Sequence, residues 1–552
     1  MKKIKNKIII SLLASGLFIT GCSIDRQPES DFADTDFWNT ENDLIYAANR
    51  LYQELDAFWI DNRGDDVVNQ GGPNAISTGN RVVPNTSGDW NDRYDEIFTA
   101  NNILEKGVKA AVTDAVKNRY LAEARFFRAY AYFNLVQKYG DVPLVLKTLD
   151  YNSPELFMPR TPRSEVVAAI YEDLDYAAQW LPVRTAIPAA QYGRVSKSTA
   201  LGLKARVGLY EGTHAKFHNR PGWQQHLEVA IAAAGLVMAQ GHTLYPSYPN
   251  LFQHIAEGPA NTENLLVKIF GVSNTNLLLG HNNSRDLENG RMAPTRNLLR
   301  QYLYADGLPA FNADNTPAAI PSPLFVPEAD EASYNTILQN RDPRMGYTLF
   351  LAGEEAYKGP WVPTTSLGSR SGYAPKKGFS IVDQSINGAG TVDKILMRYA
   401  EVLLIYAEAK FELNESISDA DLDLSINKLR TRAGFNVHLT NAFVADNNLS
   451  MRDEIRRERT VELALEGFRY DDLIRWKLAE LLLPAELLGA KYVPADWPGT
   501  NVGNLNLNAA NVIIVETDAS RNFQPNRDYL YPVPINEINL SGGAVVQNPN
   551  WQ

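Results

Sequence analysis

The sequence predicts a mostly α-helical protein: tetratricopeptide-like helical hairpins with an irregular mixed α/β insert packed against them. Apolar residues recur every three or four positions in two long regions, which is the spacing of one helix face. Short loops join the helices within each region, which favours hairpins, although no clean repeat of about 34 residues is visible. Between the two regions, residues 245–395 are rich in Gly, Pro, Asn and Ser and show little periodicity.

Composition sets the limits of this fold. The chain has 552 residues, of which 45% are hydrophobic and 21% charged, so it can bury a sizeable core. Its single cysteine, Cys22, allows no internal disulfide. The net charge of −11 becomes −15 once the four lysines of residues 1–21 are removed. A surface this acidic does not attract nucleic acid, and it suits a neutral ligand better than a polyanion.

The first 22 residues have the order of a lipoprotein signal. Lys2 to Lys7 are cationic, and the apolar run from Ile8 to Thr20 has 13 residues, whereas a membrane span needs about 20. The stretch Ile19-Thr20-Gly21-Cys22 resembles the bacterial lipobox, which implies removal of residues 1–21 and lipidation (palmitate) of Cys22. The other interpretation, a buried cysteine in a short core helix, is disfavoured by the order of charge, apolar run, small residues and cysteine.

Residues 22–36 are polar, and we expect them to form a flexible tether. Asp25, Glu29 and Asp31 resemble the export signal that sends Bacteroidota lipoproteins to the outer face. The expected location is therefore the outer membrane, with the protein lipid-anchored and facing the cell exterior.

Helical spacing is clearest in the N-terminal part, residues 37–244. One predicted helix carries Tyr120, Ala124, Phe127, Ala131 and Leu135 on a single face and ends at Gly140. Thr161 and Pro162 are expected to be the N-cap and first residue of the next helix. Two more helices are expected at residues 198–210 and 227–238.

The insert, residues 245–395, is expected to contain short strands such as 262–270 and to help build the ligand surface, because long irregular stretches are often functional. Helices return in residues 396–552, which we assign to the same body as the N-terminal part. They are expected at residues 396–413, 425–432 and 452–465, followed by an irregular tail.

Collinear motifs give the chain a family resemblance. It resembles the SusD/RagB family in the following stretches: Phe37-Trp38-Asn39-Thr40-Glu41, Trp90 to Leu104, Glu123 to Ala129 with Tyr139 to Leu144, Pro294-Thr295 to Gly307, Arg341 to Arg344, Arg398 to Ala409, Ile455 to Trp476, and the terminal Pro532-Val533-Pro534 and Gln547 to Trp551. These matches cover nearly the whole mature chain.

The resemblance implies a helical body with about four tetratricopeptide-like hairpins and a mixed insert. It also implies a glycan ligand (an oligo- or polysaccharide) and a partner, a SusC-like TonB-dependent outer-membrane transporter over which the protein sits as a lid.

The acidic residues of the motifs are interpreted as structural. Glu458 and Glu462 lie four apart on one helix face, where carboxylates repel unless cations intervene. We expect Arg459, Arg469 and Arg475 to supply those cations. The same interpretation applies to Glu401 and Glu408. Asp65 and Asp66 are a pair only by adjacency, so no catalytic residues and no enzyme activity are predicted.

No metal or cofactor is predicted apart from the covalent lipid on Cys22. The sequence has no Gly-rich phosphate loop, no nucleophile elbow and no His/Cys cluster. His214 and His218 are four apart and could share a helix face, but no third ligand is evident. A structural cation is left open.

Glycan capture needs exposed aromatic platforms beside groups that bond hydroxyls. Two loop-like zones have this chemistry, and Trp59 and Trp361 are the preferred platforms. Trp90 matches a family position, where a structural role is the alternative, and Trp38, Trp476 and Trp551 are interpreted as structural. The candidate ligand residues are Trp59, Asn62, Arg63, Asp65, Asn80, Arg81 and Trp90 in the first zone and Asn283, Trp361, Arg370 and Tyr373 in the insert.

The predicted function is glycan capture at the cell surface for delivery to the transporter. The alternative is peptide cargo, as in the RagB branch, which a cleft with few exposed aromatics would favour. A surface glycoside hydrolase and a repeat scaffold for protein partners are the remaining alternatives.

Overall fold

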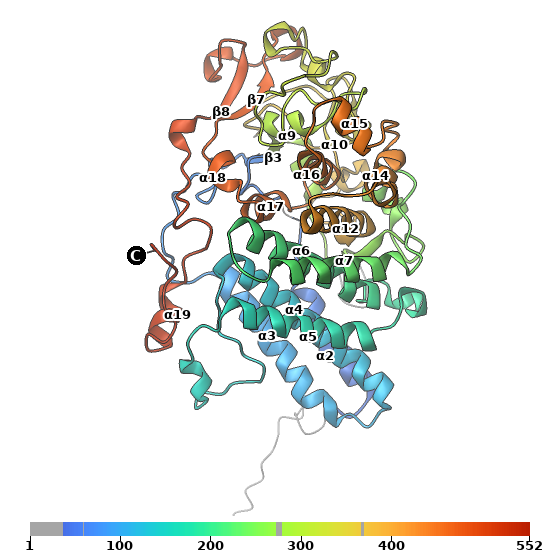
Figure 1. Ribbon diagram of the computed structural model, residues 1–552, viewed down its shortest axis with the longest axis vertical. Helices are drawn as coiled ribbons and strands as arrows, with labels where there is room; N and C mark the ends of the chain where they lie inside the picture. The colour runs from blue at the N-terminus through green and yellow to red at the C-terminus, as the bar shows by residue number, and fades with distance from the viewer. Residues whose placement is uncertain (1–36, 59, 272–278, 366–368, 552) are drawn as a thin grey trace, which may run out of the picture.

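The computed structural model describes residues 37–58, 60–271, 279–365 and 369–551. Cys22, the tether and Trp59 lie outside them. The chain is mostly helical, as predicted, and its strands are short. Figure 1 shows the N-terminal helices stacked in one half of the molecule and the insert with the C-terminal strands in the other half.

The N-terminal part is a stack of antiparallel helices in which each helix packs on the next. α3 packs on α4, α4 on α5, α5 on α6 and α6 on α7, and α12 (Tyr399–Asn414) then packs on α7 and α6. The C-terminal helices therefore extend the same stack (Figure 1). The helices of the N-terminal part are α2 (Glu41–Gln53), α3 (Gly88–Lys106), α4 (Asp114–Tyr139), α5 (Arg163–Trp180), α6 (Lys197–Phe217) and α7 (Trp223–Met238).

The central helix, α4, shows why these segments are helical. Thr113 caps its start by accepting a hydrogen bond from the Val116 amide, and Gly140 ends it with a positive φ of 74°. Its buried side chains cover most of its circumference, which is typical of a helix enclosed by others. The predicted face from Tyr120 to Leu135 is buried, and the prediction is confirmed.

The predicted start of α5 was wrong by one residue. α5 begins at Arg163 with Pro162 as its N-cap, while Thr161 pairs with Val142 in an isolated bridge. The Asp141 carboxylate caps the helix instead, because it accepts a hydrogen bond from the Arg163 amide at 2.8 Å.

A second corrected helix start concerns residues 396–398. They belong to the strand β6 (Lys394–Arg398), which pairs antiparallel with β2 (Asn264–Lys268). α12 begins only at Tyr399. The apolar spacing continues from β6 into α12, so it does not separate the two elements. Residues 396–398 are a strand because they form backbone hydrogen bonds with β2. β2 itself lies within the predicted stretch 262–270, so that prediction is confirmed.

Small antiparallel sheets join distant parts of the chain. β1 (Val67–Asn69) pairs with β3 (Met292–Pro294), and β7 (Leu487–Lys491) pairs with β8 (Val512–Glu516). β4 (Glu355–Ala356) and β5 (Gly359–Pro360) form a local hairpin. The insert does not stand alone, because Trp361 and Tyr373 share an apolar core with Ala490 and Trp497 of the C-terminal segment.

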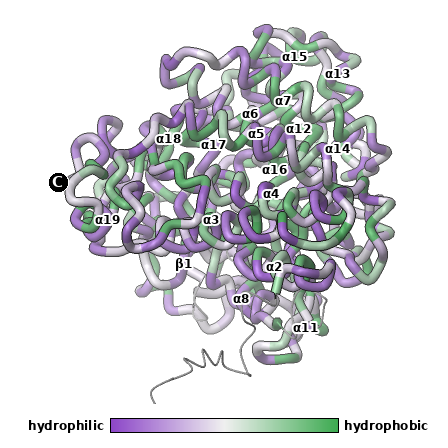
Figure 2. The backbone as a smooth tube through the Cα atoms, turned by 90° about the horizontal axis from the view of Figure 1, so that it is seen from below, coloured by the Kyte–Doolittle hydropathy of each residue, from purple (hydrophilic) through white to green (hydrophobic). Residues whose placement is uncertain are grey.

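The remaining helices are short and lie in the insert and the C-terminal segment. Figure 2 shows hydrophobic and hydrophilic residues interspersed along the chain. These helices are α8 (Asn283–Glu288), α9 (Arg296–Gln301), α10 (Pro343–Thr348), α11 (Ile381–Ser385), α13 (Asp419–Leu424), α14 (Ile426–Ala433), α15 (Asn441–Asp446), α16 (Met451–Glu462), α17 (Arg469–Arg475), α18 (Ala479–Leu482) and α19 (Ile535–Leu540).

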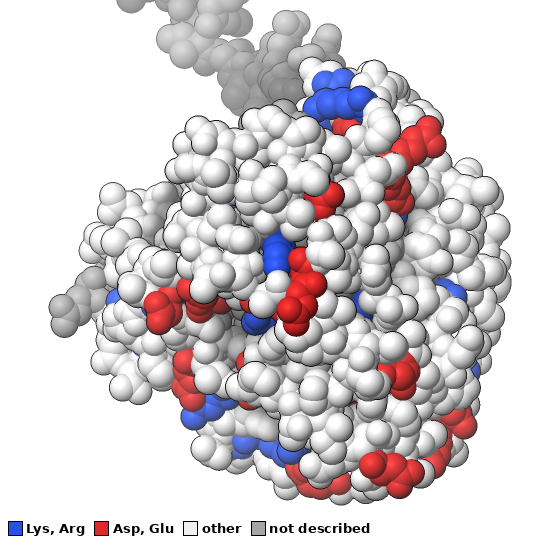
Figure 3. Space-filling model, turned by 90° about the horizontal axis from the view of Figure 1, so that it is seen from above, with Lys and Arg blue, Asp and Glu red and all other residues white. Residues whose placement is uncertain are grey.

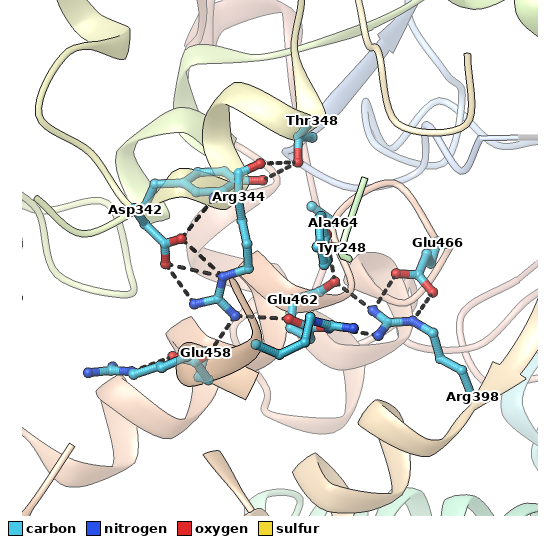
Figure 4. Close-up of polar contacts among 12 residues, drawn as sticks. Tyr248, Asp342, Arg344, Thr348, Arg398, Glu458, Glu462, Ala464 and Glu466 are labelled. Atoms are coloured by element: carbon cyan, nitrogen blue, oxygen red, sulfur yellow. Dashed lines mark hydrogen bonds and ion pairs between the residues drawn. The ribbon is translucent and has the colours of Figure 1, made fainter. Parts of the chain in front are cut away.

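A buried ion-pair network joins the insert to the C-terminal helices (Figure 4). Glu458 bonds Arg344 at 2.6 Å and Arg430 at 2.9 Å. Glu462 bonds Arg344 at 3.0 Å and Arg398 at 2.6 Å, and it also pairs with Arg432. Burial opposes the charged form of Glu462, but the three arginines outweigh it and hold its pKa far below the usual value.

The prediction of structural carboxylates is confirmed, but the partners of Glu458 and Glu462 were wrong. Arg459, Arg469 and Arg475 bond Asp472, Asp65 and Glu408 instead. Glu401 bonds the Arg206 guanidinium through both oxygens, at 2.6 and 2.7 Å. The ion pairs of the network join four separate segments between residues 342 and 466. The network residues are Asp342, Arg344, Arg398, Arg430, Arg432, Glu458, Glu462 and Glu466.

Candidate functional site

The candidate site is a cavity of about 770 Å³ between the helical stack and the C-terminal helices, named here the central cavity. This volume lies in the range of small-ligand sites, about 300–1,000 Å³. Its walls come from the loop between α2 and α3, the start of α3, one side of α4 and α6, strand β6 and helices α16 and α17.

The central cavity has a mouth and a floor. Asp56, Asp89 and Asp92 lie on its rim and are exposed. Tyr210, Arg459 and Arg475 line it as well, but they are buried. Exposure therefore falls from the α2–α3 loop and the start of α3 toward α6 and α17, which makes the site a recess rather than a flat surface.

Arg63, a predicted ligand residue, lies in the wall and is held in one position. Its guanidinium donates to both oxygens of Asp61 at 2.6 to 3.1 Å and to the Tyr531 hydroxyl at 2.9 Å. It also covers the face of the Tyr470 ring at 4.4 Å. Burial alone would lower its pKa, but Asp61 outweighs burial and the pKa lies above the usual value.

Asp471 faces the central cavity beside Arg63. Its carboxylate lies 3.8 Å from the Arg63 guanidinium, and the side chain is 29% exposed. Burial among the surrounding residues raises the pKa of Asp471, and the nearby Arg63 guanidinium only partly offsets this rise. Sequence reasoning missed Asp471 because the surrounding motif was interpreted as structural. The sequence carries no signal for it, because Arg475 lies four residues later and would be expected to pair with Asp471, whereas in the structure Arg475 pairs with Glu408 and Asp472.

The charges around the central cavity are nearly balanced. Asp89 forms an ion pair with Lys138; burial would raise the pKa of Asp89, but Lys138 holds it below its usual value. Lys394 donates to the Ala57 carbonyl at 2.6 Å, and burial lowers its pKa. The carboxylates of the lining are Asp56, Asp89, Asp92, Glu466, Asp471 and Asp472, and its cations are Arg63, Arg93, Lys138, Arg206, Lys394, Arg459 and Arg475. Such a lining suits an uncharged ligand rich in hydrogen-bonding groups.

Aromatic rings supply the apolar part of the lining. Phe468 lies between two arginines, with guanidinium carbons 5.2 Å (Arg206) and 5.1 Å (Arg459) from its centroid. Phe58, Tyr130 and Phe133 also line the cavity. Rings beside amides and charged groups are the combination that binds a sugar through its C–H faces and its hydroxyls.

A shallow pocket of about 70 Å³ adjoins the central cavity and shares Phe58, Lys394 and Glu466 with it. Asn283, at the start of α8, lies in this pocket. The structure therefore places Arg63 and Asn283, predicted from two different zones, at neighbouring hollows. Asn62 is buried next to Arg63 and accepts a hydrogen bond from Asn74, a residue of the cavity lining, at 2.9 Å.

Three aromatic residues among the predicted ligand residues are buried, so none of them offers an exposed stacking surface; the preference for Trp361 as a platform was wrong, and the structural alternative holds for Trp90. Trp90 packs edge-on against Tyr139 at 4.9 Å in the helical core. Trp361 stacks on Phe350 at 5.9 Å, and Tyr373 is fully buried and accepts a hydrogen bond from Arg296. Polar loops fold over both insert aromatics, and the composition of those loops suggested exposure. Trp59 lies outside the described residues, so its prediction stands untested.

Other predicted polar residues have partners within the fold. Asp65 is buried and bonds Arg469 through both oxygens, at 2.7 and 3.0 Å, which removes it from any catalytic pair with Asp66. Arg370 bonds Glu516 at 2.8 Å. Arg81 lies over the rings of Tyr531 and Trp551 and donates to the Asp528 carbonyl. Asn80 is exposed, and its amide donates to the Thr78 hydroxyl at 3.2 Å.

The histidine pair is engaged in packing. The His214 and His218 rings stack at 4.1 Å, His214 bonds Arg220 and His218 bonds the Ile474 carbonyl. Burial is the main cause that lowers both pKa values, for His218 to about 4. Within the described ranges, no cluster of three His, Cys, Asp or Glu residues could hold a metal ion.

The outer surface carries scattered charge, and most of its exposed large apolar side chains are aliphatic. Figure 3 shows one face on which acidic and basic groups lie in small, separate patches. Exposed aromatic rings occur singly, and they include Tyr46, Phe98, Tyr151, Phe157 and Tyr357. No arc of aromatic platforms is therefore visible among the residues that the structure describes, whereas the central cavity combines rings with polar groups.

Comparison with known proteins agrees with this architecture. A model of the SusD family matches residues 271–551, and a model described as starch-binding, associating with the outer membrane, matches residues 36–209. SusD-like protein P2 of Formosa agariphila is 27% identical over 590 residues, and the match covers 100% of both chains. A SusD-like protein of Bacteroides ovatus is 26% identical over 90% of this chain and 86% of its own. The crystal structure of a SusD-like carbohydrate-binding protein from Bacteroides fragilis has a TM-score of 0.75 at 26% identity, covering 91% of this chain and 99% of that one.

Proposed function

The chain belongs to the SusD family, and from that premise we propose that it captures an oligo- or polysaccharide at the cell surface and delivers it to a SusC-like TonB-dependent transporter. The observation that carries the proposal is a polar, charge-balanced cavity in a chain that shares its fold, at 26% identity, with a carbohydrate-binding protein. In this proposal the protein binds and does not catalyse.

The proposal includes a lipid anchor on Cys22. The lipobox-like stretch and the polar residues that follow it support anchoring through acyl chains. No helix in the described part of the chain is long and apolar enough to cross a bilayer. The family description, which places starch binding at the outer membrane, supports the same location.

Peptide cargo is the second candidate. Burial of Trp90, Trp361 and Tyr373 favours it, because a glycan surface built on those rings is ruled out. The near balance of charge in the central cavity favours glycan, because peptide ends are charged. A hydrolase is disfavoured by the Asp65–Arg469 ion pair, since the candidate acid is already bonded.

Affinity electrophoresis tests the proposal. The soluble chain from Ser23 onward would run through gels that contain neutral or acidic polysaccharides, beside a blank gel. We expect selective retardation by at least one neutral polysaccharide. If no polysaccharide retards the chain but short peptides bind in a titration, peptide cargo replaces glycan. Release of reducing sugar by the pure protein would contradict the non-catalytic role.

Co-purification tests delivery. The lipidated protein would be purified in mild detergent from the outer membrane of its own host. We expect it to bring a TonB-dependent transporter with it in a fixed ratio. Purification of the lipoprotein alone, in every detergent that leaves other outer-membrane complexes intact, would contradict the transporter partnership.

A further inference from the structure

The floor of the central cavity holds polar groups that the fold itself does not use. Arg459 is only 3% exposed, and its Nε bonds both oxygens of Asp472 at 3.0 and 2.8 Å. Its Nη1 is buried and has no acceptor among the described residues. Arg459 nevertheless lines the central cavity, and among the described residues its guanidinium donates hydrogen bonds only to Asp472, so it has donor capacity left for a ligand atom.

The walls above Arg459 offer the complementary groups. The Asp471 carboxylate accepts no hydrogen bond from any residue in the described ranges, and its one ion pair, with Arg63, is 3.8 Å long. Gln137, on α4, lines the cavity, and its amide is likewise unused by described residues. The recess therefore presents a hydrogen-bond donor, Arg459, an acceptor, Asp471, and the Gln137 amide, which can donate and accept. A sugar hydroxyl, which donates and accepts at one atom, matches that set.

The shape of the cavity limits how a glycan can enter. Arg459 is at the buried end, and the exposed residues of the described lining, Asp56, Ala57, Gly88, Asp89 and Asp92, come from the α2–α3 loop and the start of α3, so the recess opens on that side. A polymer that lies across this opening does not reach the floor. A chain end does, and the volume of about 770 Å³ admits a short oligosaccharide.

Resting on the proposed function, we infer that the central cavity is an end-recognition site that takes the terminal units of an uncharged glycan and bonds them through Arg459, Asp471 and Gln137. Arg63, fixed by Asp61 and Tyr470, positions Asp471. The lining carries nearly equal numbers of carboxylates and cations, so it offers no excess of positive charge that would favour an acidic sugar over a neutral one.

Calorimetric titration with named probes tests the inference. The probes are cellotetraose, laminaritetraose, mannotetraose and xylotetraose, with tetra-alanine as the peptide probe. We expect at least one tetrasaccharide to bind once per chain, and its hexasaccharide to bind with the same affinity per molecule, because only end units enter. Affinity that rises steadily with length, or no binding by any of the four, would overturn the inference.

Two pairs of variants place the binding in the cavity. Asp471→Asn and Gln137→Leu should each weaken the bound tetrasaccharide roughly tenfold or more. The matched exposed changes Asp446→Asn on α15 and Gln224→Leu on α7 should leave it unchanged. Thermal unfolding of each variant controls for folding, and equal affinity in all four variants would contradict the site.

The outcomes separate this inference from the proposed function. Retardation by a polysaccharide without binding of any tetrasaccharide would reject end recognition and keep glycan capture. Binding of tetra-alanine alone would reject both.

Discussion

Two charged regions of this protein lie close together and differ in how their charges are used. At the centre of the network, Glu458 and Glu462 each bond at least two arginines, and the side chains of these two carboxylates are at most 2% exposed. In the central cavity, Asp471 has one long ion pair, and Arg459 keeps a nitrogen without an acceptor among described residues. The first region holds elements together, and the second has bonding capacity left for a ligand.

The largest expected effect is the loss of a network carboxylate. Glu462→Gln would leave Arg344, Arg398 and Arg432 without their shared partner, and breaking a buried pair costs about 3–5 kcal/mol. We expect a clear drop in the thermal and urea unfolding midpoints.

The exposed Glu165→Gln on α5 is the matched control and should unfold like the unmodified chain. Equal midpoints for Glu462→Gln and Glu165→Gln would show that the network does not stabilise the fold.

The next largest effect is expected at Trp361, which the sequence suggested as a ligand platform and the structure places in the core. Trp361→Ala removes a ring stacked between Phe350 and Tyr334, and such changes cost about 3–5 kcal/mol. We expect a lower unfolding midpoint but unchanged retardation by polysaccharide below the transition. Lost retardation in a chain that is still folded would restore Trp361 as a ligand residue.

The structure shows which features of the fold the sequence could predict. α4 and α12 were identified because apolar spacing is local, and the acidic motif was recognised as structural because like charges four apart need cations. The actual cations, Arg344, Arg398, Arg430 and Arg432, come from other segments, so no spacing could reveal them. Residues 396–398 were misassigned because their partner β2 lies over 100 residues earlier.

The candidate site was less predictable than the fold. Arg63 and Asn283 were found because polar residues in loops often bind ligands. Trp361 and Tyr373 occur in similar loops, and only tertiary packing shows that they are buried. Asp471, Gln137 and Arg459 sit on helices whose residues looked structural, and their orientation into a cavity depends on three elements that meet only in the folded chain.

A smaller effect is expected from acid. In the unfolded chain His214 and His218 titrate near the usual value of about 6.5, whereas burial keeps them neutral in the fold, His218 down to about pH 4. Between these values the unfolded chain binds more protons. The contribution of the two neutral histidines to the free energy of unfolding is therefore fully present above about pH 6.5. As pH falls below that value, about 1–2 kcal/mol is lost, after allowance for solvent screening.

The comparison of urea midpoints at pH 7 and pH 5 measures this loss, and the double change His214→Gln with His218→Gln should reduce it. A midpoint difference that is identical in the double variant would assign the acid sensitivity to other groups.

The smallest effect is expected at the rim of the central cavity. Lys138→Ala breaks the ion pair with Asp89, whose side chain is 45% exposed, and exposed pairs contribute about 0–1 kcal/mol. We expect an unfolding midpoint within experimental error of the unmodified chain. A loss as large as that of Glu462→Gln would erase the distinction between the two regions.

The most direct test fills the central cavity. Gln137→Trp would place a large ring in the open volume beside Asp471, while the network residues are untouched. The measurement is affinity electrophoresis with the polysaccharide that retards the unmodified chain, with the unfolding midpoint as control. We predict that retardation is lost and that the midpoint stays the same. Unchanged retardation by a folded Gln137→Trp chain would contradict the assignment of the central cavity as the glycan site.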